Sequence, residues 1–151
     1  MCQRRRIKKE KFEKGRLKSE LDQLQSLDHP HIVHILELLM DDDHYYFVME
    51  LIETGNLLEW ITQAHKNNWT MTQVDIAKIV MQILKALNYM HKKEIIHRDL
   101  KLENVMVDIE DGELICKLTD FGFSSLLDSE GIASGYCGTL KHMAPEIVKK
   151  E

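Results

Sequence analysis

The feature that most constrains the fold is a stripe of apolar residues between positions 73 and 92. Its members recur three or four positions apart: Ile76, Ile79, Val80, Ile83, Leu84, Leu87 and Met90. This spacing puts them on one side of an α-helix, and the stripe is a wide one. A stripe of this kind is more typical of a core-facing helix than of a cofactor-binding segment, so we predict a long core helix here.

Composition limits the class of protein. The chain has 151 residues, of which 44% are hydrophobic and 30% charged; this is ordinary for one globular domain and excludes a disordered or collagen-like chain. The net charge of -5 disfavours binding to nucleic acid. Three cysteines cannot form a closed set of disulfides, which favours a reducing, intracellular compartment, cytoplasmic or nuclear. There is neither a signal peptide nor an apolar run of membrane-spanning length, so we expect no membrane contact.

Two segments before the stripe, residues 32–40 and 45–52, are rich in β-branched and aromatic residues and predict a β-hairpin. Asp41, Asp42 and Asp43 lie between them. Aspartates can ligate a metal, but no further ligands follow at the spacing of a metal-binding loop. We therefore interpret the three aspartates as a hairpin tip.

The same kind of pattern predicts the remaining elements. Leucines recur at helical spacing over residues 17–27, and the helix is expected to end before Pro30. A short helix is predicted over residues 57–65. Two short strands, residues 105–109 and 114–119, are joined by a turn with Asp-Gly at its centre.

The two ends of the chain are less regular. The first eleven residues form a basic run that includes Arg4, Arg5 and Arg6. We interpret it as a solvated strand that leads into a helix, although such runs can also be nuclear-import or nucleic-acid patches. Residues 120–146 are polar, contain glycines and show little periodicity, which predicts a long loop of the kind that is usually functional or disordered.

Four motifs in the second half of the chain carry the functional information. His97-Arg98-Asp99-Leu100-Lys101-Leu102-Glu103-Asn104 follows the long helix, and Asp120-Phe121-Gly122 follows the last predicted strand. Cys137-Gly138-Thr139 and Ala144-Pro145-Glu146 close the long loop. In this order and spacing they resemble the catalytic loop, the magnesium-binding motif and the end of the activation segment of eukaryotic protein kinases.

The resemblance implies an α+β, two-lobed, protein-kinase-like fold that is incomplete at both ends. Residues 1–52 would form part of the small lobe, with the last part of its third strand, its helix C, strands 4 and 5 and the start of the hinge. Residues 53–151 would form part of the large lobe, with helices D and E, the catalytic loop, the magnesium motif and the activation segment.

The resemblance also assigns the chemistry, with ATP and Mg²⁺ as cofactors. Asp99 would orient the substrate hydroxyl and accept its proton, and Lys101 would offset charge on the γ-phosphate, because phosphoryl transfer depends on positioning and charge neutralisation. Asn104 and Asp120 offer oxygen ligands that suit Mg²⁺. Plainer alternatives exist: a buried Asp or Asn can cap a turn, and a lone Lys is usually solvated.

A further set of residues is implied to surround the nucleotide. Glu20 matches the helix glutamate that pairs with the ATP-binding lysine, Met49 matches the gatekeeper, and the backbone of the next residues would bond to adenine. The full set is Glu20, Met49, Glu50, Ile52, Asn56, Glu103, Met106 and Asp120. Another group resembles the stacked regulatory spine of the family and consists of Leu24, Ile35, His97 and Phe121. A place in this group would make His97 a structural residue rather than a base.

The sequence departs from the family in four respects. No Gly-rich phosphate loop precedes the first predicted helix, and the place of the ATP-binding lysine falls near Arg5, or at Lys8 in a slipped register. Arginine is not equivalent, because its planar guanidinium places charge differently. Asn56 stands where many relatives carry a ribose-contacting glutamate, so only Glu103 supports a preference for basic substrates. The later large-lobe helices are absent, so we expect exposed apolar surface and self-association.

We therefore predict a fragment of an ATP-dependent serine/threonine protein kinase. Lys101 resembles the serine/threonine type, and residues 27–33 resemble the calcium/calmodulin-dependent and SNF-like group. The expected partners are a protein substrate with a Ser or Thr hydroxyl and a regulatory domain or partner outside the chain. Ser134 is a candidate phosphosite with Arg98 as its partner. The 151 residues alone are expected to transfer little phosphate. The alternatives are a short pseudokinase that acts as a binding or scaffold module, and an unrelated α+β protein.

Overall fold

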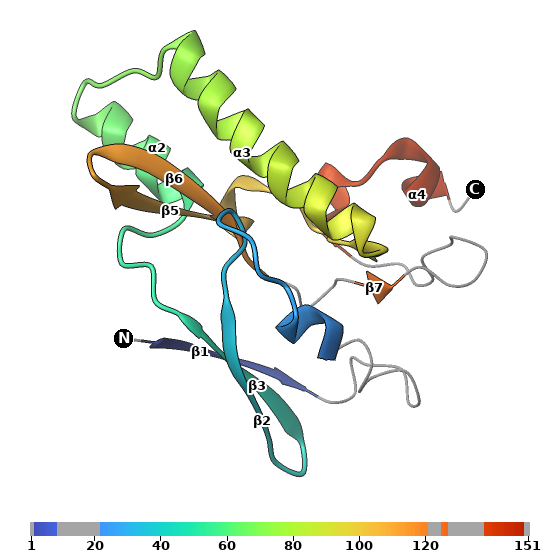
Figure 1. Cartoon of the computed structure of the whole chain (residues 1–151). Coiled ribbons are helices and arrows are strands. Elements are labelled where there is room, and N and C mark those ends of the chain that lie inside the picture. The colour runs from blue at the N-terminus through green and yellow to red at the C-terminus, as the bar shows by residue number, and fades with distance from the viewer. Residues whose placement is uncertain (1, 9–21, 121–124, 127–137, 150–151) are drawn as a thin grey trace.

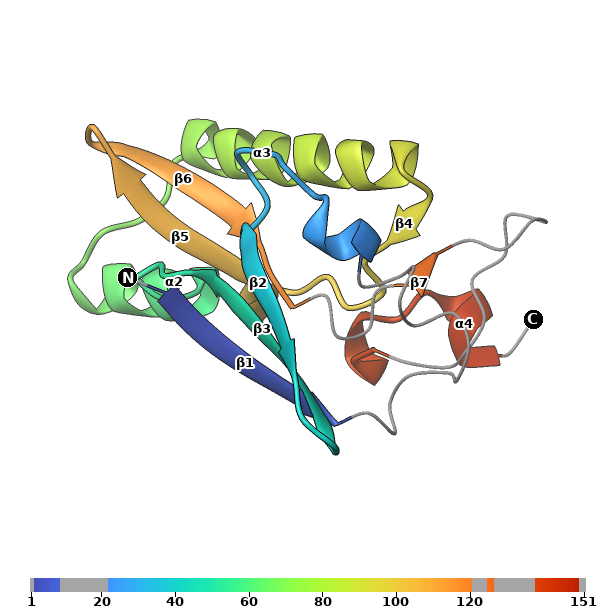
Figure 2. The ribbon, with the colours of Figure 1, turned by 60° about the horizontal axis from the view of Figure 1, so that its bottom comes forward.

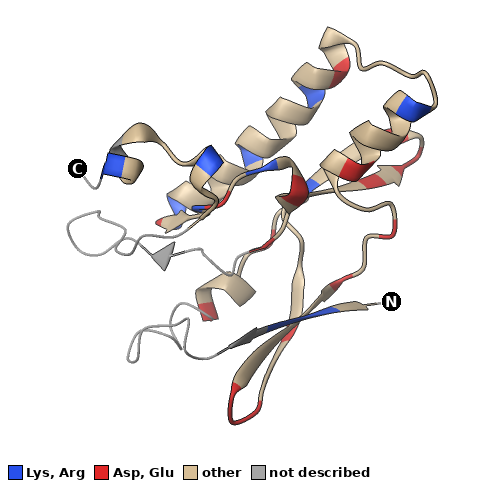
Figure 3. Cartoon of the chain, turned by 180° about the vertical axis from the view of Figure 1, so that it is seen from behind, with Lys and Arg blue, Asp and Glu red and all other residues tan. Residues whose placement is uncertain are grey.

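The computed structural model describes residues 2–8, 22–120, 125–126 and 138–149. Near the N-terminus, strands β1 (Cys2–Lys8), β2 (Ile35–Met40) and β3 (His44–Glu50) form an antiparallel sheet in the order β1-β3-β2 (Figure 1). The predicted hairpin is thereby confirmed, and so is the strand interpretation of the basic run. Figure 3 shows the basic middle of β1 and the acidic tip of the hairpin on this one sheet.

The hairpin tip is held by its own first aspartate. Asp41 Oδ1 accepts hydrogen bonds from the backbone N–H groups of Asp43 at 2.9 Å and of His44 at 2.7 Å. A side chain that caps its own turn in this way is a common reason for Asp at such positions. Within the described residues no group of three or more His, Cys, Asp or Glu side chains could hold a metal ion.

Two helices follow, α2 (Leu57–Lys66) and α3 (Gln73–Lys92). Each begins with a capping box, in which the cap side chain and an acidic residue three positions later bond to each other's backbone N–H groups. The caps are Asn56 with Glu59 and Thr72 with Asp75. Both helices were predicted, and α3 spans the predicted residues.

The long helix lies along a second hairpin, made of β5 (Val105–Glu110) and β6 (Glu113–Leu118) (Figures 1 and 2). Gln82 of α3 fixes this packing, because its amide nitrogen donates to the Leu114 carbonyl at 2.9 Å and its amide oxygen accepts from the Cys116 N–H at 2.7 Å. These bonds satisfy backbone groups at the edge of β6 that water would otherwise have to reach.

Only part of the apolar stripe on α3 is covered. Ile79, Ala86 and Met90 are buried, whereas Ile76, Val80 and Leu84 have relative exposures of 45%, 47% and 56%. The expectation of exposed apolar surface is therefore confirmed for the described residues. No helix in the described part of the chain is long and apolar enough to cross a membrane.

The remaining elements are short. They are β4 (Ile95–Ile96), β7 (Ser125–Leu126), the 3-10 turns η2 (Leu102–Asn104) and η4 (Leu140–His142), and α4 (Pro145–Lys149). Strand β4 pairs with β7. Of the helix predicted over residues 17–27, positions 22–25 are helical, and positions 17–21 lie outside the described residues.

Backbone bonds tie the segment before β2 to the end of β6. The Val33 N–H donates to the Leu118 carbonyl at 2.8 Å, and the Leu118 N–H donates to the His31 carbonyl at 2.9 Å. Leu118 lies two residues before Asp120, so this junction joins the first sheet to the strand that leads into the candidate site.

Candidate active site

The loop between β4 and β5 is organised around a buried histidine. His97 is 2% exposed, and its Nε2 lies 2.9 Å from the Thr119 carbonyl oxygen, while its Nδ1 accepts from the Asp99 N–H at 3.4 Å. Burial lowers the pKa of His97, so the imidazole is neutral, with its proton on Nε2. This geometry agrees with the structural role expected for His97.

Asp99, 2% exposed, lies at the centre of the site. Its Oδ1 accepts from the Thr139 N–H at 2.9 Å and the Thr139 hydroxyl at 2.6 Å. Its Oδ2 accepts from Lys101 Nζ at 2.8 Å and Asn104 Nδ2 at 2.9 Å. Asp99, Lys101 and Asn104, which the sequence singled out, therefore meet at one carboxylate, and Thr139 of the Cys137-Gly138-Thr139 motif bonds to it as well.

The donors around Asp99 determine its charge. Burial alone would raise the pKa of this carboxyl, but the hydrogen bonds from Lys101, Thr139 and Asn104 lower it to about 2. The carboxylate is therefore ionised at neutral pH and fixed in orientation. Lys101 also donates to the Thr139 hydroxyl at 2.7 Å, so it braces the same cluster instead of extending freely into solvent.

Asn104 is placed to offer an oxygen. It is 5% exposed, and its Nδ2 donates to the Asp99 backbone carbonyl at 2.8 Å as well as to the carboxylate. With Nδ2 engaged, Oδ1 is the acceptor that remains, and none of the described residues donates to it. A buried amide oxygen without a donor fits a hard cation such as Mg²⁺.

Asp120, the other residue expected to hold Mg²⁺, is 8% exposed and has a φ of +69°, in the left-handed region. Arg98, in the catalytic loop, has a φ of +63°. Non-glycine residues adopt this conformation rarely, although Asp does so more readily than most, and Asn68, Glu94 and Asp111 share it among the described residues. An aspartate and an asparagine oxygen are suitable for Mg²⁺ only together with other oxygens, such as nucleotide phosphates and water.

Arg5 contacts Asp120, a contact that sequence reasoning did not find. The distance from Arg5 Nη2 to Asp120 Oδ2 is 2.6 Å, although the two residues are 115 positions apart. Arg5 lies opposite Phe47 in the sheet, whereas Lys8 lies opposite His44 at the far end of the strand pair. The register therefore brings Arg5, and not Lys8, to the place expected for the ATP-binding lysine.

The predicted hinge follows β3. Met49 is buried, and Glu50 is held by Lys117 Nζ at 2.8 Å and by the His34 N–H at 2.9 Å. Ile52 is 4% exposed, and none of the described residues bonds to its backbone N–H or C=O. Buried backbone groups are nearly always paired, so this pair of groups is suitable for an adenine ring.

Asn56, one of the residues expected at the nucleotide, has another structural task. Asn56 uses its side-chain oxygen to cap α2, accepting from the Glu59 N–H at 2.9 Å, which leaves its amide N–H₂ for any ligand. Its backbone forms a bridge with Met106, which is half-buried on β5. Glu103 is exposed in η2. The cluster of Asp99, Lys101, Asn104 and Thr139 is thus better defined than the residues expected around the nucleotide.

Gly138 belongs to the Cys137-Gly138-Thr139 motif, and the structure gives a physical reason for a glycine there. Its φ is +106°, and a Cβ built there would lie 2.4 Å from the Arg98 carbonyl oxygen. Only glycine allows the backbone to come this close to the catalytic loop. The next residue, Thr139, is thereby brought to Asp99. Three other candidates, Glu20, Phe121 and Ser134, lie outside the described residues.

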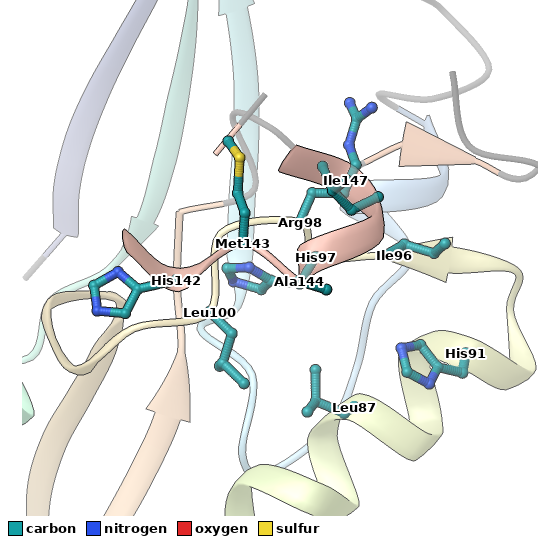
Figure 4. A pocket seen from close by; sticks show the side chains of 10 residues that line it. All are labelled: Leu87, His91, Ile96, His97, Arg98, Leu100, His142, Met143, Ala144 and Ile147. Atoms are coloured by element: carbon teal, nitrogen blue, oxygen red, sulfur yellow. The ribbon is translucent and has the colours of Figure 1, made fainter. Parts of the chain in front are cut away.

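A cavity of about 360 Å³ lies behind the catalytic loop (Figure 4). Its lining is mainly apolar and consists of Leu87, His91, Ile96, His97, Arg98, Leu100, His142, Met143, Ala144 and Ile147. Asp99, Lys101, Asn104 and Asp120 do not line it. The cavity is therefore lined by neighbours of the candidate chemical residues, such as His97 and Arg98, and by Leu87 and His91 from the end of α3.

Comparison with known proteins agrees with this geometry. The family model of the protein kinase domain matches residues 2–151. Calcium/calmodulin-dependent protein kinase type 1 of Macrobrachium nipponense is 35% identical over 135 residues, covering 89% of this chain and 38% of that protein. Calcium-dependent protein kinase 6 of Plasmodium berghei is 38% identical over 146 residues, covering 96% and 10%. Serine/threonine-protein kinase RAD53 of Saccharomyces cerevisiae is 36% identical over 130 residues, covering 86% and 15%.

The chain therefore spans at most 38% of the length of these three relatives. The match nevertheless extends over nearly all of its own residues, and it includes the catalytic loop and the motif around Asp120. The α+β architecture, with its antiparallel sheet followed by helices, agrees with a partial kinase fold. On the family match and the shared motifs, this chain belongs to the protein kinase family.

Proposed function

We propose that this chain carries the phosphoryl-transfer centre of an ATP-dependent serine/threonine protein kinase. The observation that carries the proposal is the buried, ionised Asp99 carboxylate with its fixed donors from Lys101, Asn104 and Thr139. The hydroxyl of Thr139, 2.6 Å from Oδ1, is the same chemical group as the hydroxyl of a Ser or Thr substrate. Its contact supports an aliphatic alcohol as the acceptor of phosphate.

The low pKa of Asp99 bears on its role. A carboxylate with a pKa of about 2 is a weak base at neutral pH, so it contributes mainly by orienting the substrate hydroxyl for attack. Lys101 keeps positive charge beside it, in a position to offset charge on the transferred phosphate. Both actions require the loop to hold its shape, which the bonds to Thr139 and Asn104 provide.

ATP and Mg²⁺ are the proposed cofactors, as in the protein kinase family generally. Mg²⁺, when bound, neutralises charge on the nucleotide phosphates. Asn104 Oδ1 and the Asp120 carboxylate would hold the ion, and the backbone groups of Glu50 and Ile52 would bind adenine. Residues 1–52 and 53–151 would then be parts of the small and large lobes.

Nucleotide binding by the 151-residue chain tests the proposal. A fluorescent ATP analogue should bind in the presence of Mg²⁺, and Asp120→Asn should weaken it by about tenfold or more, since even indirect partners of metal ligands have effects of that size. Asp108→Asn is the matched control, because Asp108 lies on β5 and, among the described residues, its carboxylate accepts from the neighbouring Ile109 N–H alone. Equal binding by both variants would refute a nucleotide site at Asp120.

A second candidate, a binding or scaffold module without catalysis, is supported by one observation. The Asp120 carboxylate already has a cationic partner in Arg5, at 2.6 Å. Under this alternative the chain would bind no nucleotide, and Asp120→Asn would change stability alone. Transfer of labelled phosphate to a basic peptide, abolished by Asp99→Asn, would exclude it.

The wider setting of the activity is also a proposal. Two of the relatives are named as calcium-dependent or calcium/calmodulin-dependent kinases, which supports a regulatory domain or partner outside these 151 residues. Dependence on ATP supports an intracellular location. The substrate would be a protein that presents a Ser or Thr hydroxyl to Asp99.

A further inference from the structure

The contact between Arg5 and Asp120 joins the first strand to the candidate metal site. Arg5 lies near the middle of β1, opposite the buried Phe47, so its side chain extends from the inner side of the sheet. The side chain of Arg5 is 39% exposed and that of Asp120 is 11% exposed. The guanidinium is therefore partly open to solvent, whereas the carboxylate is largely buried.

The guanidinium of Arg5 is a cation 2.6 Å from the Asp120 carboxylate. It can leave Asp120 only by moving away. A divalent cation placed at Asp120 and Asn104 would approach the same carboxylate as the guanidinium, and two cations at one carboxylate repel each other.

We propose that Arg5 is a built-in counter-ion of Asp120 that competes with the divalent cation for this carboxylate until nucleotide is bound. The inference rests on the proposed function, because it assumes that Asp120 is a metal ligand. The triphosphate of a bound nucleotide adds negative charge beside both cations, which removes the repulsion between them. Arg5 is thus a positioning residue that makes the metal site depend on nucleotide.

The proposal predicts opposite effects on two kinds of binding. Without nucleotide, Arg5→Met should bind Mn²⁺ about fivefold more tightly than the wild-type chain, the change that corresponds to about 1 kcal/mol for a partly exposed ion pair. With Mg²⁺ present, the same variant should bind a fluorescent ATP analogue more weakly. A purely structural role for Arg5 would weaken both kinds of binding together.

The experiment uses the full 151-residue chain and titrates Mn²⁺ by electron paramagnetic resonance of the free ion. Arg4→Met is the matched control, because it removes the same charge from the neighbouring position of β1, where Arg4 lies 4.0 Å above the Tyr46 ring. Its Mn²⁺ affinity should stay within about twofold of the wild-type value, as befits a screened surface charge.

Each outcome has a defined meaning. Tighter Mn²⁺ binding by Arg5→Met, abolished by adding Asp120→Asn, supports the proposal. Unchanged or weaker binding, in a variant whose thermal unfolding is cooperative, overturns it while leaving the metal site intact. If neither the wild type nor Arg5→Met binds Mn²⁺ through Asp120, the metal site of the proposed function fails and the inference fails with it.

Discussion

Replacing Thr139 by valine tests whether the cluster around Asp99 stabilises the protein as well as the site. Valine keeps the shape of the side chain but removes the hydroxyl that donates to Asp99 at 2.6 Å and accepts from Lys101 at 2.7 Å. Hydrogen bonds to charged groups contribute about 1.5–3 kcal/mol each. Asp99 retains its bonds to the Thr139 N–H and to Asn104, and Lys101 can turn to water, so we expect a total loss of about 2 kcal/mol.

The assay is urea unfolding followed by tryptophan fluorescence, with the slope of the transition unchanged. A loss of about 2 kcal/mol corresponds to a fall in Tm of about 4–8 °C for a chain of this size. Thr62→Val is the matched control, because Thr62 also donates a hydroxyl hydrogen bond, to the Leu58 carbonyl at 2.7 Å, but on an exposed helix face. Its effect should stay within about 0.5 kcal/mol. Equal stabilities for the two variants would contradict the reasoning.

Three further predictions concern other parts of the chain. Gly138→Ala should destabilise the fold by at least about 1 kcal/mol more than Gly112→Ala. Both glycines have positive φ, but of the two added Cβ atoms only the one at Gly138 would meet backbone atoms. Equal losses of stability for the two variants in chemical denaturation would contradict this reasoning. The pKa of Asp99 is lowered from 3.8 to about 2. Its ionised form therefore stabilises the fold above about pH 4, and this contribution is lost as the pH falls towards about 2. Across this pH range the urea midpoint should fall less steeply for Asp99→Asn than for the wild-type chain. Leu84→Glu should reduce the self-association expected of the chain, as measured by sedimentation velocity. Leu84 is 56% exposed within the uncovered apolar stripe of α3. Unchanged association would show that the stripe around Leu84 is not the surface through which copies of the chain associate.

Local sequence signals were sufficient for most of the secondary structure. The helix α3 and both hairpins follow from periodicity and turn residues, which act over a few positions. The pairing of β4 with β7 could not be predicted in this way, because strands of two residues have no period to detect. The role of Asn56 as a helix cap was missed although its signal was present, since Glu59 follows three positions later, as in other capping boxes.

For the site, the sequence predicted which residues take part but not how they lie relative to one another. The motifs identified Asp99, Lys101, Asn104 and Asp120 by resemblance, but the composition and spacing of the chain do not contain the distances between them. The contact of Arg5 with Asp120 depends on the register of β1 against β3 and on a separation of 115 positions, neither of which a local pattern reports.

The backbone junction between Val33 and Leu118 has a mechanical consequence. Within the described residues the first sheet is also tied to the rest by the ion pairs Lys117–Glu50 and Arg5–Asp120. Arg5 lies on β1, at the edge of that sheet, whereas Val33 precedes β2 at its other edge. Any rocking of the sheet about the Val33–Leu118 junction would displace Arg5 relative to Asp120, so the separation of these two side chains would report that motion.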